Sequence, residues 1–334
     1  MAKTFDPSRR AILAGAATLA AFGNAAAQTL EKIRYLTPFG YIMGFADAMY
    51  SQSGGFFAKQ GLDVDIQGGR GSAMAVQQIS AGNVLISRTG GTDLIKAYVK
   101  DPSIVAFGEI YQRDIFHVIS NETKPIKTPV DMAGKTIGVV SVGGATENIL
   151  DMMLAKSGVP TSSVKRESVG NAPAAFELIN QGRIDAYIAT NDTVSQLQVD
   201  KKPIFIWSTD TIAPCPGQVY ITSRKTIAEK PETLARFVRA VHEALGAMIA
   251  AKDLQPILTS MTSKYEIFEA NRPDKGLLVL KSTIDGVRPP YRDRLASAPA
   301  GWRSAYELMI QAKIIEPVSK QDFYTDEILR RAFG

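Results

Sequence analysis

The feature that most constrains the fold of this chain is a regular alternation of strand-like and helix-like segments. Residues 62–69, LDVDIQGG, alternate apolar and polar side chains with the period of two that a half-buried strand shows. Residues 72–82, SAMAVQQISAG, follow with apolar side chains at helical spacing and end at Gly82. The order repeats from residue 84, with VLISRTGG as a strand and TDLIKAYVKD as a helix. This alternation predicts a mostly parallel sheet with crossover helices.

A second α/β unit follows the first along the chain. TIGVV, residues 136–140, reads as a strand, and residues 145–160 have helical spacing with Gly158 as the cap. From Pro231 onward the sequence is mainly helical, and we expect these helices to complete the first unit. The predicted domains are 28–118 plus 212–334 for lobe I and 119–211 for lobe II. Such a chain crosses between the lobes twice, near residues 117–121 and 208–220, which makes a hinge around a cleft.

Composition narrows the possible functions. The chain has 334 residues, 45% of them hydrophobic, so it can bury a sizeable core, and its one cysteine, Cys215, cannot form an internal disulfide. His117 and His242 lie far apart and leave no metal-ligand spacing, so we expect neither a metal nor a cofactor. The net charge of +5 comes from scattered residues rather than a basic stripe, so nucleic acid is not an expected partner. We expect a monomer.

The N-terminus has the pattern of an export signal. SRRAILAGAATLAAFGNAAAQ, residues 8–28, has a basic start, an apolar stretch too short to span a membrane, and three alanines before Gln28. Arg9 and Arg10 resemble the twin-arginine signal. An amphipathic N-terminal helix is the alternative interpretation, but the small-residue cleavage pattern counts against it. We therefore predict that residues 1–27 are removed and that the mature protein is periplasmic.

Loops at the carboxyl ends of the strands are the expected ligand site. In open parallel sheets, ligands bind where these loops collect. The rule selects TPFGY, GGRGSA and SRTGGT in lobe I, and SVGGAT and ATND in lobe II, with Tyr111 near the first crossing. The candidate ligand-binding residues are Phe39, Tyr41, Arg70, Ser72, Arg88, Thr89, Gly90, Tyr111, Ser141, Gly143, Gly144, Ala145, Thr146, Asn191 and Asp192.

Each type of candidate residue has a chemical role and an ordinary structural alternative. The glycines of SVGGAT allow close backbone approach, and the following helix offers unpaired N–H groups to an oxyanion or other acceptor, although an ordinary tight turn would have the same residues. Arg70 and Arg88 could clasp an oxyanion or be solvated. We favour core packing for Phe39 and the pocket for Tyr41. Neither glycine turn matches a phosphate-binding or dinucleotide-binding fingerprint.

The segments GGFFAKQGLDVDI, PVDMAGKTIGVVSVGGATENILDMMLAKSGV and AFELINQGRIDAYIA, in that order, resemble a known family. They are similar to the solute-binding proteins of ABC importers for nitrate, sulfonates, taurine and thiamine-pyrimidine precursors, the SsuA/THI5-like (NMT1) group. The resemblance implies a type II periplasmic-binding-protein fold, two α/β lobes that close on a small solute, and a membrane permease with its ATPase as partners. The aromatic-rich segment TPFGYIMGFADAMYSQSGGFF departs from the family pattern and leaves the solute open.

Three function classes are compatible with these features. The leading hypothesis is a non-enzymatic binding subunit for a small organic anion or a heteroaromatic solute, of sulfonate, carboxylate or pyrimidine-precursor type. The enzymatic alternative is a THI5-like pyrimidine synthase, but the chain lacks the cysteine-rich segment that the resemblance would require. The third class is a sensor that presents the same closed lobes and solute to a membrane receptor.

Overall fold

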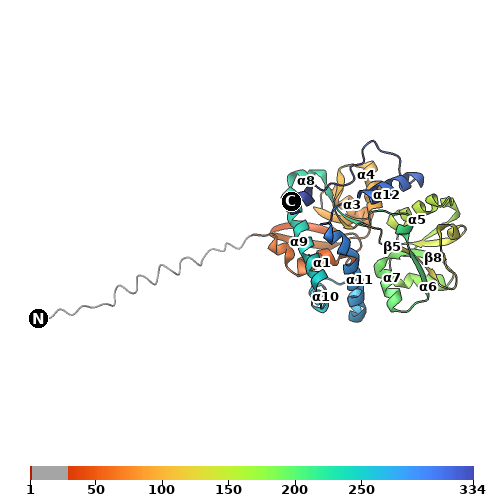
Figure 1. The fold of residues 1–334 in the computed structure, drawn as a ribbon, viewed down its shortest axis with the longest axis horizontal. Coiled ribbons are helices and arrows are strands. Elements are labelled where there is room, and N and C mark those ends of the chain that lie inside the picture. The colour runs from red at the N-terminus through yellow and green to blue at the C-terminus, as the bar shows by residue number, and fades with distance from the viewer. Residues whose placement is uncertain (2–28) are drawn as a thin grey trace.

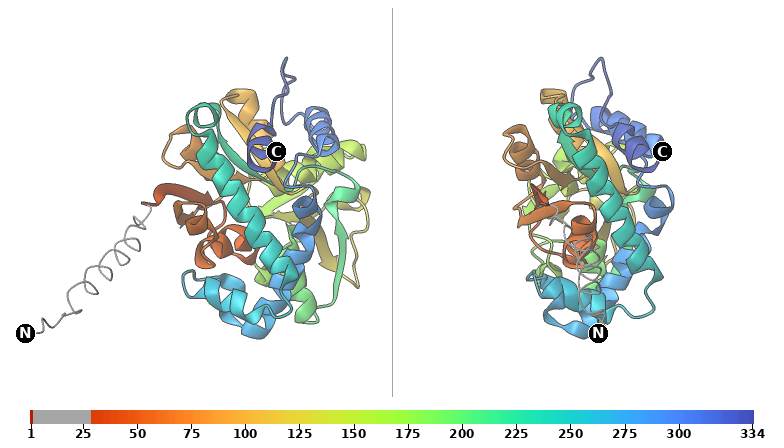
Figure 2. Two further views of the ribbon diagram at one scale, coloured as in Figure 1. Left: turned by 60° about the vertical axis from the view of Figure 1, so that its left-hand side comes forward. Right: turned by 90° about the vertical axis from the view of Figure 1, so that its left-hand side faces the viewer.

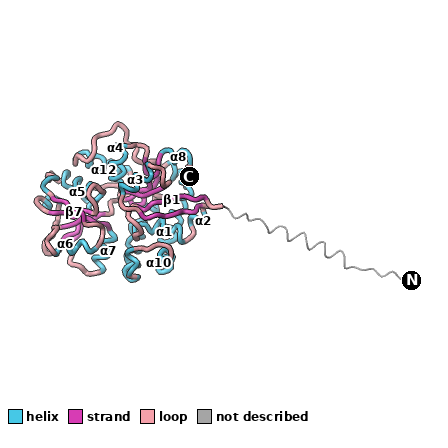
Figure 3. The backbone as a smooth tube through the Cα atoms, turned by 180° about the vertical axis from the view of Figure 1, so that it is seen from behind, coloured by secondary structure: helices cyan, strands magenta, loops and turns pink. Residues whose placement is uncertain are grey.

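The computed structural model describes Met1 and residues 29–334, so the predicted export segment lies almost wholly outside the described residues. The chain forms two α/β lobes that lie side by side (Figure 1). Each lobe is built on its own five-stranded sheet, and the helices cover the sheet faces (Figure 3). Within the described part of the chain, no helix combines the length and the hydropathy that crossing a bilayer requires.

The sheet of lobe I has the strand order β2-β1-β3-β10-β4. Strands β1, β2 and β3 run parallel, and β10 pairs antiparallel with both β3 and β4. The parallel strands confirm the predicted crossover architecture, and the strand that reverses direction is the one that re-enters from lobe II. Its strands are β1 (Glu31–Thr37), β2 (Leu62–Gly68), β3 (Ile86–Thr89), β4 (Ile104–Tyr111) and β10 (Gln218–Ser223).

The sheet of lobe II repeats this plan with the order β7-β6-β8-β5-β9. Strands β6, β7 and β8 are parallel, and β5, which enters from lobe I, is antiparallel to β8 and β9. Both sheets therefore direct the carboxyl ends of their parallel strands into loops that can face a common ligand. The strands are β5 (Phe116–Asn121), β6 (Thr136–Val139), β7 (Lys165–Ser168), β8 (Ala186–Thr190) and β9 (Ile204–Ser208).

Helices surround the two sheets, and the long helix α9 runs along lobe I (Figure 2). Gly55 adopts a left-handed conformation at φ 78° and separates α1 from α2. The α-helices are α1 (Ala46–Ser53), α2 (Phe56–Lys59), α3 (Ser72–Ser80), α4 (Gly91–Lys100), α5 (Ala145–Lys156), α6 (Phe176–Asn180), α7 (Asn191–Val199), α8 (Arg224–Glu229), α9 (Pro231–Ala250), α10 (Gln255–Thr262), α11 (Pro273–Arg292), α12 (Pro299–Gln311) and α13 (Glu327–Phe333).

Short 3-10 turns complete the fold and include two that matter for the site, η1 (Met43–Phe45) and η6 (Phe268–Asn271). The turn that follows Thr128 begins with Pro129, and Thr128 and Asp131 form a reciprocal capping box. The remaining turns are η2 (Pro129–Met132), η3 (Thr161–Ser163), η4 (Pro173–Ala175) and η5 (Thr209–Thr211).

The sheets are joined by residues 112–115, between β4 and β5, and by residues 209–217, between β9 and β10. The change of lobe that the sequence suggested after residue 118 falls inside β5, because Phe116–Asn121 already pairs within the second sheet. We therefore propose that the lobes divide at these two connections. The helices α11 and α12 pack on lobe I and also on α7 and α5 of lobe II.

Candidate functional site

A cavity of about 220 Å³, here called the main chamber, lies between the two lobes. Its wall on one side comes from the loops that follow β1 and β2 of lobe I. Its other wall comes from the first residue of β5, the loops that follow β6 and β7, the start of α5 and the last residue of β8 in lobe II. The lining residues are Phe39, Arg70, Gly71, Ser72, Ala73, Phe116, Val140, Ser141, Val142, Gly143, Gly144, Ala145, Thr146, Asn171 and Thr190.

The turn from Ser141 to Gly144 forms one end of the main chamber and leads into α5. Gly143 takes the left-handed conformation at φ 78°, which a side chain would disfavour. The backbone N–H groups of Glu147 and Asn148 donate to the Gly144 carbonyl. The preceding N–H groups of Ala145 and Thr146 stand at the positive end of the α5 dipole, where a helix has no internal acceptor for them. This end of the chamber is suited to a hydrogen-bond acceptor.

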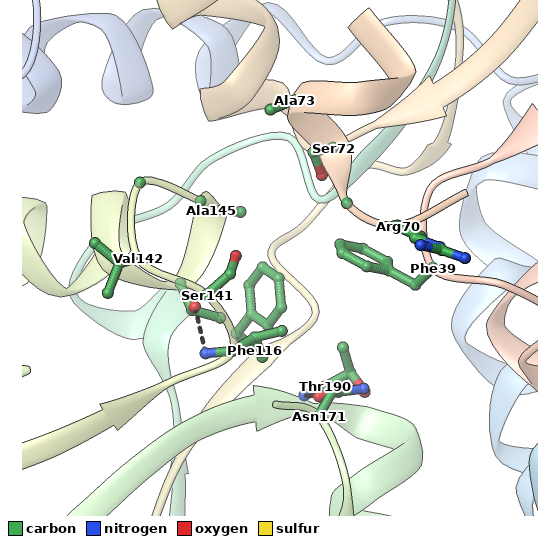
Figure 4. A pocket seen from close by; sticks show the side chains of 15 residues that line it. Phe39, Arg70, Ser72, Ala73, Phe116, Ser141, Val142, Ala145, Asn171 and Thr190 are labelled. Carbon is green, nitrogen blue, oxygen red and sulfur yellow. Dashed lines mark hydrogen bonds between the residues drawn. The ribbon is translucent and has the colours of Figure 1, made fainter. Parts of the chain in front are cut away.

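Aromatic side chains from both lobes line the middle of the main chamber (Figure 4). Phe39 comes from the loop after β1, and its ring stacks on Phe45 at a centroid distance of 6.5 Å. Phe116 begins β5 in lobe II and is 3% exposed. Aromatic surface at both walls favours a ligand with a planar or apolar body.

The amide of Asn171 holds Thr190 in place at the floor of the chamber. Asn171 Nδ2 donates to Thr190 Oγ1 at 2.9 Å, and Asn171 Oδ1 accepts from the backbone N–H of Thr190 at 3.1 Å. The two bonds join the loop after β7 to the end of β8, so the lobe II wall is preorganised before a ligand arrives.

Polar contacts beside the main chamber connect the lobes directly. Asn148 Nδ2 on α5 donates to Asp93 Oδ1 on α4 at 3.2 Å. Lys96 Nζ donates to Asn148 Oδ1 at 3.3 Å and to the Gly143 carbonyl at 3.4 Å. Burial raises the pKa of Asp93 to about 6, while Ser72 and Lys96 act in the opposite direction. The lobes are therefore closed on each other at the level of the chamber.

A smaller cavity of about 30 Å³, here called the deep chamber, adjoins the main chamber through the shared residues Phe39 and Thr190. It reaches toward α11 and the β10 end of lobe I. Its lining residues are Phe39, Ile42, Gly44, Phe45, Arg88, Tyr111, Ile115, Thr190, Asn191, Asp192, Gln218, Ser282, Thr283 and Gly286.

Arg88 lies in the wall of the deep chamber but is engaged within lobe I. Arg88 Nη1 contacts Asp47 Oδ1 at 2.7 Å and the Gly44 carbonyl at 3.1 Å, and both charged side chains are almost fully buried. The guanidinium also lies over the Phe45 ring at 4.7 Å, and the Tyr220 hydroxyl donates to the other oxygen of Asp47. Arg88 Nη1 is therefore committed to lobe I, whereas Arg88 Nε is buried without a hydrogen-bond partner among the described residues.

Two further carboxyl groups meet at the turn η1. Asp192, from α7 of lobe II, lies so close to Gly44 that a Cβ at that position would be 3.0 Å from Asp192 Oδ2. Glu269 Oε2 accepts from the Met43 backbone N–H at 3.0 Å. Burial raises the pKa of Asp192 to about 6 and that of Glu269 to about 8, and the negative charge of Asp192 adds to the effect on Glu269.

The structure brings twelve of the fifteen candidate residues to these two cavities. Tyr41 is not among them: its hydroxyl donates to the Ile66 carbonyl, and its ring packs 5.2 Å from Tyr265. Thr89 is fully buried, and Gly90 faces Ala145 across the lobes, where an added Cβ would be 3.5 Å from the alanine Cβ. The structure therefore places Phe39 at the main chamber and Tyr41 outside it, the reverse of what we favoured, because the Tyr41 hydroxyl has a polar partner on β2. Whether the twelve bind a ligand stays a prediction.

Several lining residues escaped the sequence interpretation. Asn171 follows β7 and precedes a helix, so the same loop rule could have selected it. Phe116 starts a strand and carries no local signal, because its position at the cavity depends on the crossing between the lobes. Thr283 and Gly286 lie in the middle of α11, where helical spacing alone suggests ordinary packing.

The two-lobed fold is that of the type II periplasmic binding proteins. A protein from Bordetella bronchiseptica RB50 has a TM-score of 0.68 at 20% identity, with 90% of this chain and 96% of that one covered. The alkanesulfonate-binding protein SsuA from Xanthomonas axonopodis pv. citri, solved with bound MOPS, has a TM-score of 0.64 at 14% identity, with 88% and 98% covered.

The chain belongs to the NMT1/THI5-like family, whose model matches residues 43–253. The formylaminopyrimidine-binding protein of Halalkalibacterium halodurans is 25% identical over 280 residues, which cover 78% of this chain and 81% of the relative. The matched region includes both connections between the lobes and the strand and loop residues of the main chamber from residue 70 onward.

Proposed function

We propose that this protein is the periplasmic substrate-binding subunit of an ABC importer. In this role it captures a small organic anion or heteroaromatic solute between its lobes and delivers it to a permease. The observation that carries the proposal is the main chamber, which is enclosed by loops from both lobes and combines an aromatic middle with a helix N-terminus at one end. A ligand held in this way would be gripped from both sides and would stabilise the closed form.

The comparisons support both solute types for different parts of the chamber. The relative from Halalkalibacterium halodurans is named for a formylaminopyrimidine, and a heteroaromatic ring suits the walls formed by Phe39 and Phe116. The Xanthomonas protein binds alkanesulfonate, and an oxyanion suits the N–H groups of Ala145 and Thr146. Arg70, exposed at the chamber, adds a positive charge to the same cavity.

Export to the periplasm and partnership with a permease and its ATPase follow from this assignment. The pattern in residues 8–28 supports export, and its twin arginines favour a twin-arginine route. The described residues form two lobes around one interlobe site, which fits a monomer that works alone until it meets the permease.

Neither Cys215 nor His117 has the setting of a catalytic side chain, which favours binding over catalysis. Cys215 lies in the second connection between the lobes, and burial raises the pKa of its thiol well above its usual value, which disfavours the reactive thiolate. His117 points from β5 with a pKa lowered by burial and lines neither chamber. A THI5-like synthase remains the enzymatic alternative, and a solute sensor would use the same closed lobes.

The test is a thermal-shift screen of residues 28–334 against nitrate, sulfonates, carboxylates and aminopyrimidines. A solute at one hundred times its dissociation constant stabilises the folded state by about 2.7 kcal/mol, which moves the melting temperature by several degrees. Denatured protein is extracted in parallel, and released small molecules are identified by mass spectrometry. If neither a shift nor a released solute is found, the solute-binding function is refuted.

A further inference from the structure

We infer that the deep chamber is a subsite for a hydrogen-bond-donating group of the solute, an amino group on a planar ring, and that Asp192 selects for it. This inference rests on the proposed function, because the deep chamber adjoins the main chamber and would receive one end of a solute bound there. It narrows the solute from any small anion or ring to one that carries a donor at the end opposite to its acceptor.

The hydrogen-bond acceptors in the wall have capacity left for such a group. Asp192 Oδ1 accepts from Thr283 Oγ1 at 3.4 Å, a long bond that leaves most of the lone pairs of the carboxylate available. Gln218 Oε1 is buried and has no hydrogen-bond partner within the described residues. A buried acceptor without a partner is unfavourable, so a ligand N–H that reached Gln218 would remove an existing penalty.

Charges around the deep chamber favour a donor over an oxyanion. The positive charge of Arg88 on β3 is compensated by Asp47 on α1, at 2.7 Å. Asp192 on α7 and Glu269 on η6 are the other carboxyl groups that meet at the turn η1. Burial makes the ionisation of both groups unfavourable. A neutral or cationic amino group would relieve that penalty, whereas a second anion would increase it.

Size supports the same assignment. The deep chamber, at about 30 Å³, is much smaller than the main chamber of about 220 Å³, so it is suited to one small end of a solute rather than to its body. The Gly144 to Thr146 turn in the main chamber has the opposite polarity, because it presents N–H donors. A solute that satisfies both ends therefore carries its acceptor near α5 and its amino group at Asp192.

The experiment measures dissociation constants by titration calorimetry for compound pairs that differ only by an amino or a methyl group. The pairs are 4-aminopyrimidine with 4-methylpyrimidine, para-aminobenzoate with para-methylbenzoate, and para-aminobenzenesulfonate with para-methylbenzenesulfonate. The proteins are the mature wild type, Asp192→Asn, and Asp200→Asn as a matched control. Asp200 caps the same helix α7, is partly exposed, and pairs with the buried Lys275 of α11 outside both chambers.

In the wild type, we expect the amino member of at least one pair to bind about tenfold or more tightly than its methyl partner, the size of a hydrogen bond to a charged acceptor. This ratio should fall toward one in Asp192→Asn and persist in Asp200→Asn. If every amino compound binds no more tightly than its methyl partner, the subsite is overturned. The binding measured in that case still supports the solute-binding function. If Asp192→Asn does not fold, the wild-type ratios decide alone, and absence of binding by all six compounds also overturns the subsite.

Discussion

Replacing Arg88 should destabilise the protein strongly, because the side chain is part of a buried ion pair rather than a free ligand clamp. Arg88 is 1% exposed and Asp47 3% exposed, with 2.7 Å between Nη1 and Oδ1. Arg88→Met keeps most of the apolar volume but leaves the Asp47 carboxylate without its counter-charge. Removing one partner of a buried pair typically costs about 3–5 kcal/mol, and we expect the free energy of unfolding to fall by this amount.

The assay is urea-induced unfolding of the ligand-free mature protein, followed by circular dichroism and checked by calorimetry. For a folded chain of roughly 300 residues with an unfolding entropy of about 2.1 cal/mol/K per residue, the same loss lowers the melting temperature by about 5–8 °C. The double variant Arg88→Met with Asp47→Asn should recover most of the loss, because an amide is cheaper to bury than an unpaired carboxylate and can still accept from Tyr220.

Arg70→Met is the matched control for this prediction. Arg70 is exposed at the main chamber, so its replacement should change the free energy of unfolding by less than about 0.5 kcal/mol. If Arg88→Met lost less than about 1 kcal/mol, the pair would behave like an exposed salt bridge. That result would refute the argument that Arg88 is committed to Asp47, and it would restore Arg88 as a candidate anion clamp.

Four further predictions test the hinge and the chambers. Burial raises the pKa of Asp114 to about 7, so between about pH 4 and 7 the folded state holds a proton that the unfolded state releases. The contribution of this group to stability is therefore complete below about pH 4 and is lost as the pH rises through 7. In Asp114→Asn this loss should disappear, and the melting temperature should change less with pH. Gly217→Ala should destabilise the second connection by about 1–3 kcal/mol in urea unfolding, because the new Cβ would lie 2.1 Å from the Arg113 carbonyl oxygen; unchanged stability would contradict the close approach. Phe116→Ala should weaken the binding of a ring-bearing solute about tenfold in calorimetry, with Phe116→Leu intermediate, and equal affinities would remove Phe116 from the site. Affinity for para-aminobenzoate should fall as the pH drops through about 6 in the wild type, because protonation neutralises Asp192, and should change less in Asp192→Asn.

The backbone architecture could be predicted well because it is written in local periodicities. Alternation within β2 and helical spacing within α3 reflect which face of each element is buried, and neighbouring residues alone reveal that. The SVGGAT turn could be selected for the same reason, since its glycines and the following helix are adjacent in the chain. The break between α1 and α2 is less evident from the sequence, because it depends on the left-handed conformation of Gly55 inside an otherwise helical pattern.

Side-chain roles at the site depended on partners that lie far away in the sequence. Phe39 and Tyr41 belong to one loop and are chemically alike, but only the position of Ile66 on the neighbouring strand gives the tyrosine hydroxyl a partner. The role of Arg88 was left open between an oxyanion clamp and a solvated side chain, and the structure shows it in a buried pair with Asp47, 41 positions earlier. Pattern analysis cannot assign such pairs, because the approach of two helices or strands is not encoded in the spacing of either one.

The sequence by itself determined two α/β units, a family resemblance, an export pattern and a glycine turn that leads into a helix, since each depends on residues close together in the chain. Only the tertiary structure decided that Phe116 and Asn171 face Phe39 across a cavity, and that Asp192 reaches lobe I beside Gly44. The physical reason is that the chain crosses twice between the sheets. The geometry of those crossings, rather than any local pattern, sets which loops of one lobe meet which loops of the other.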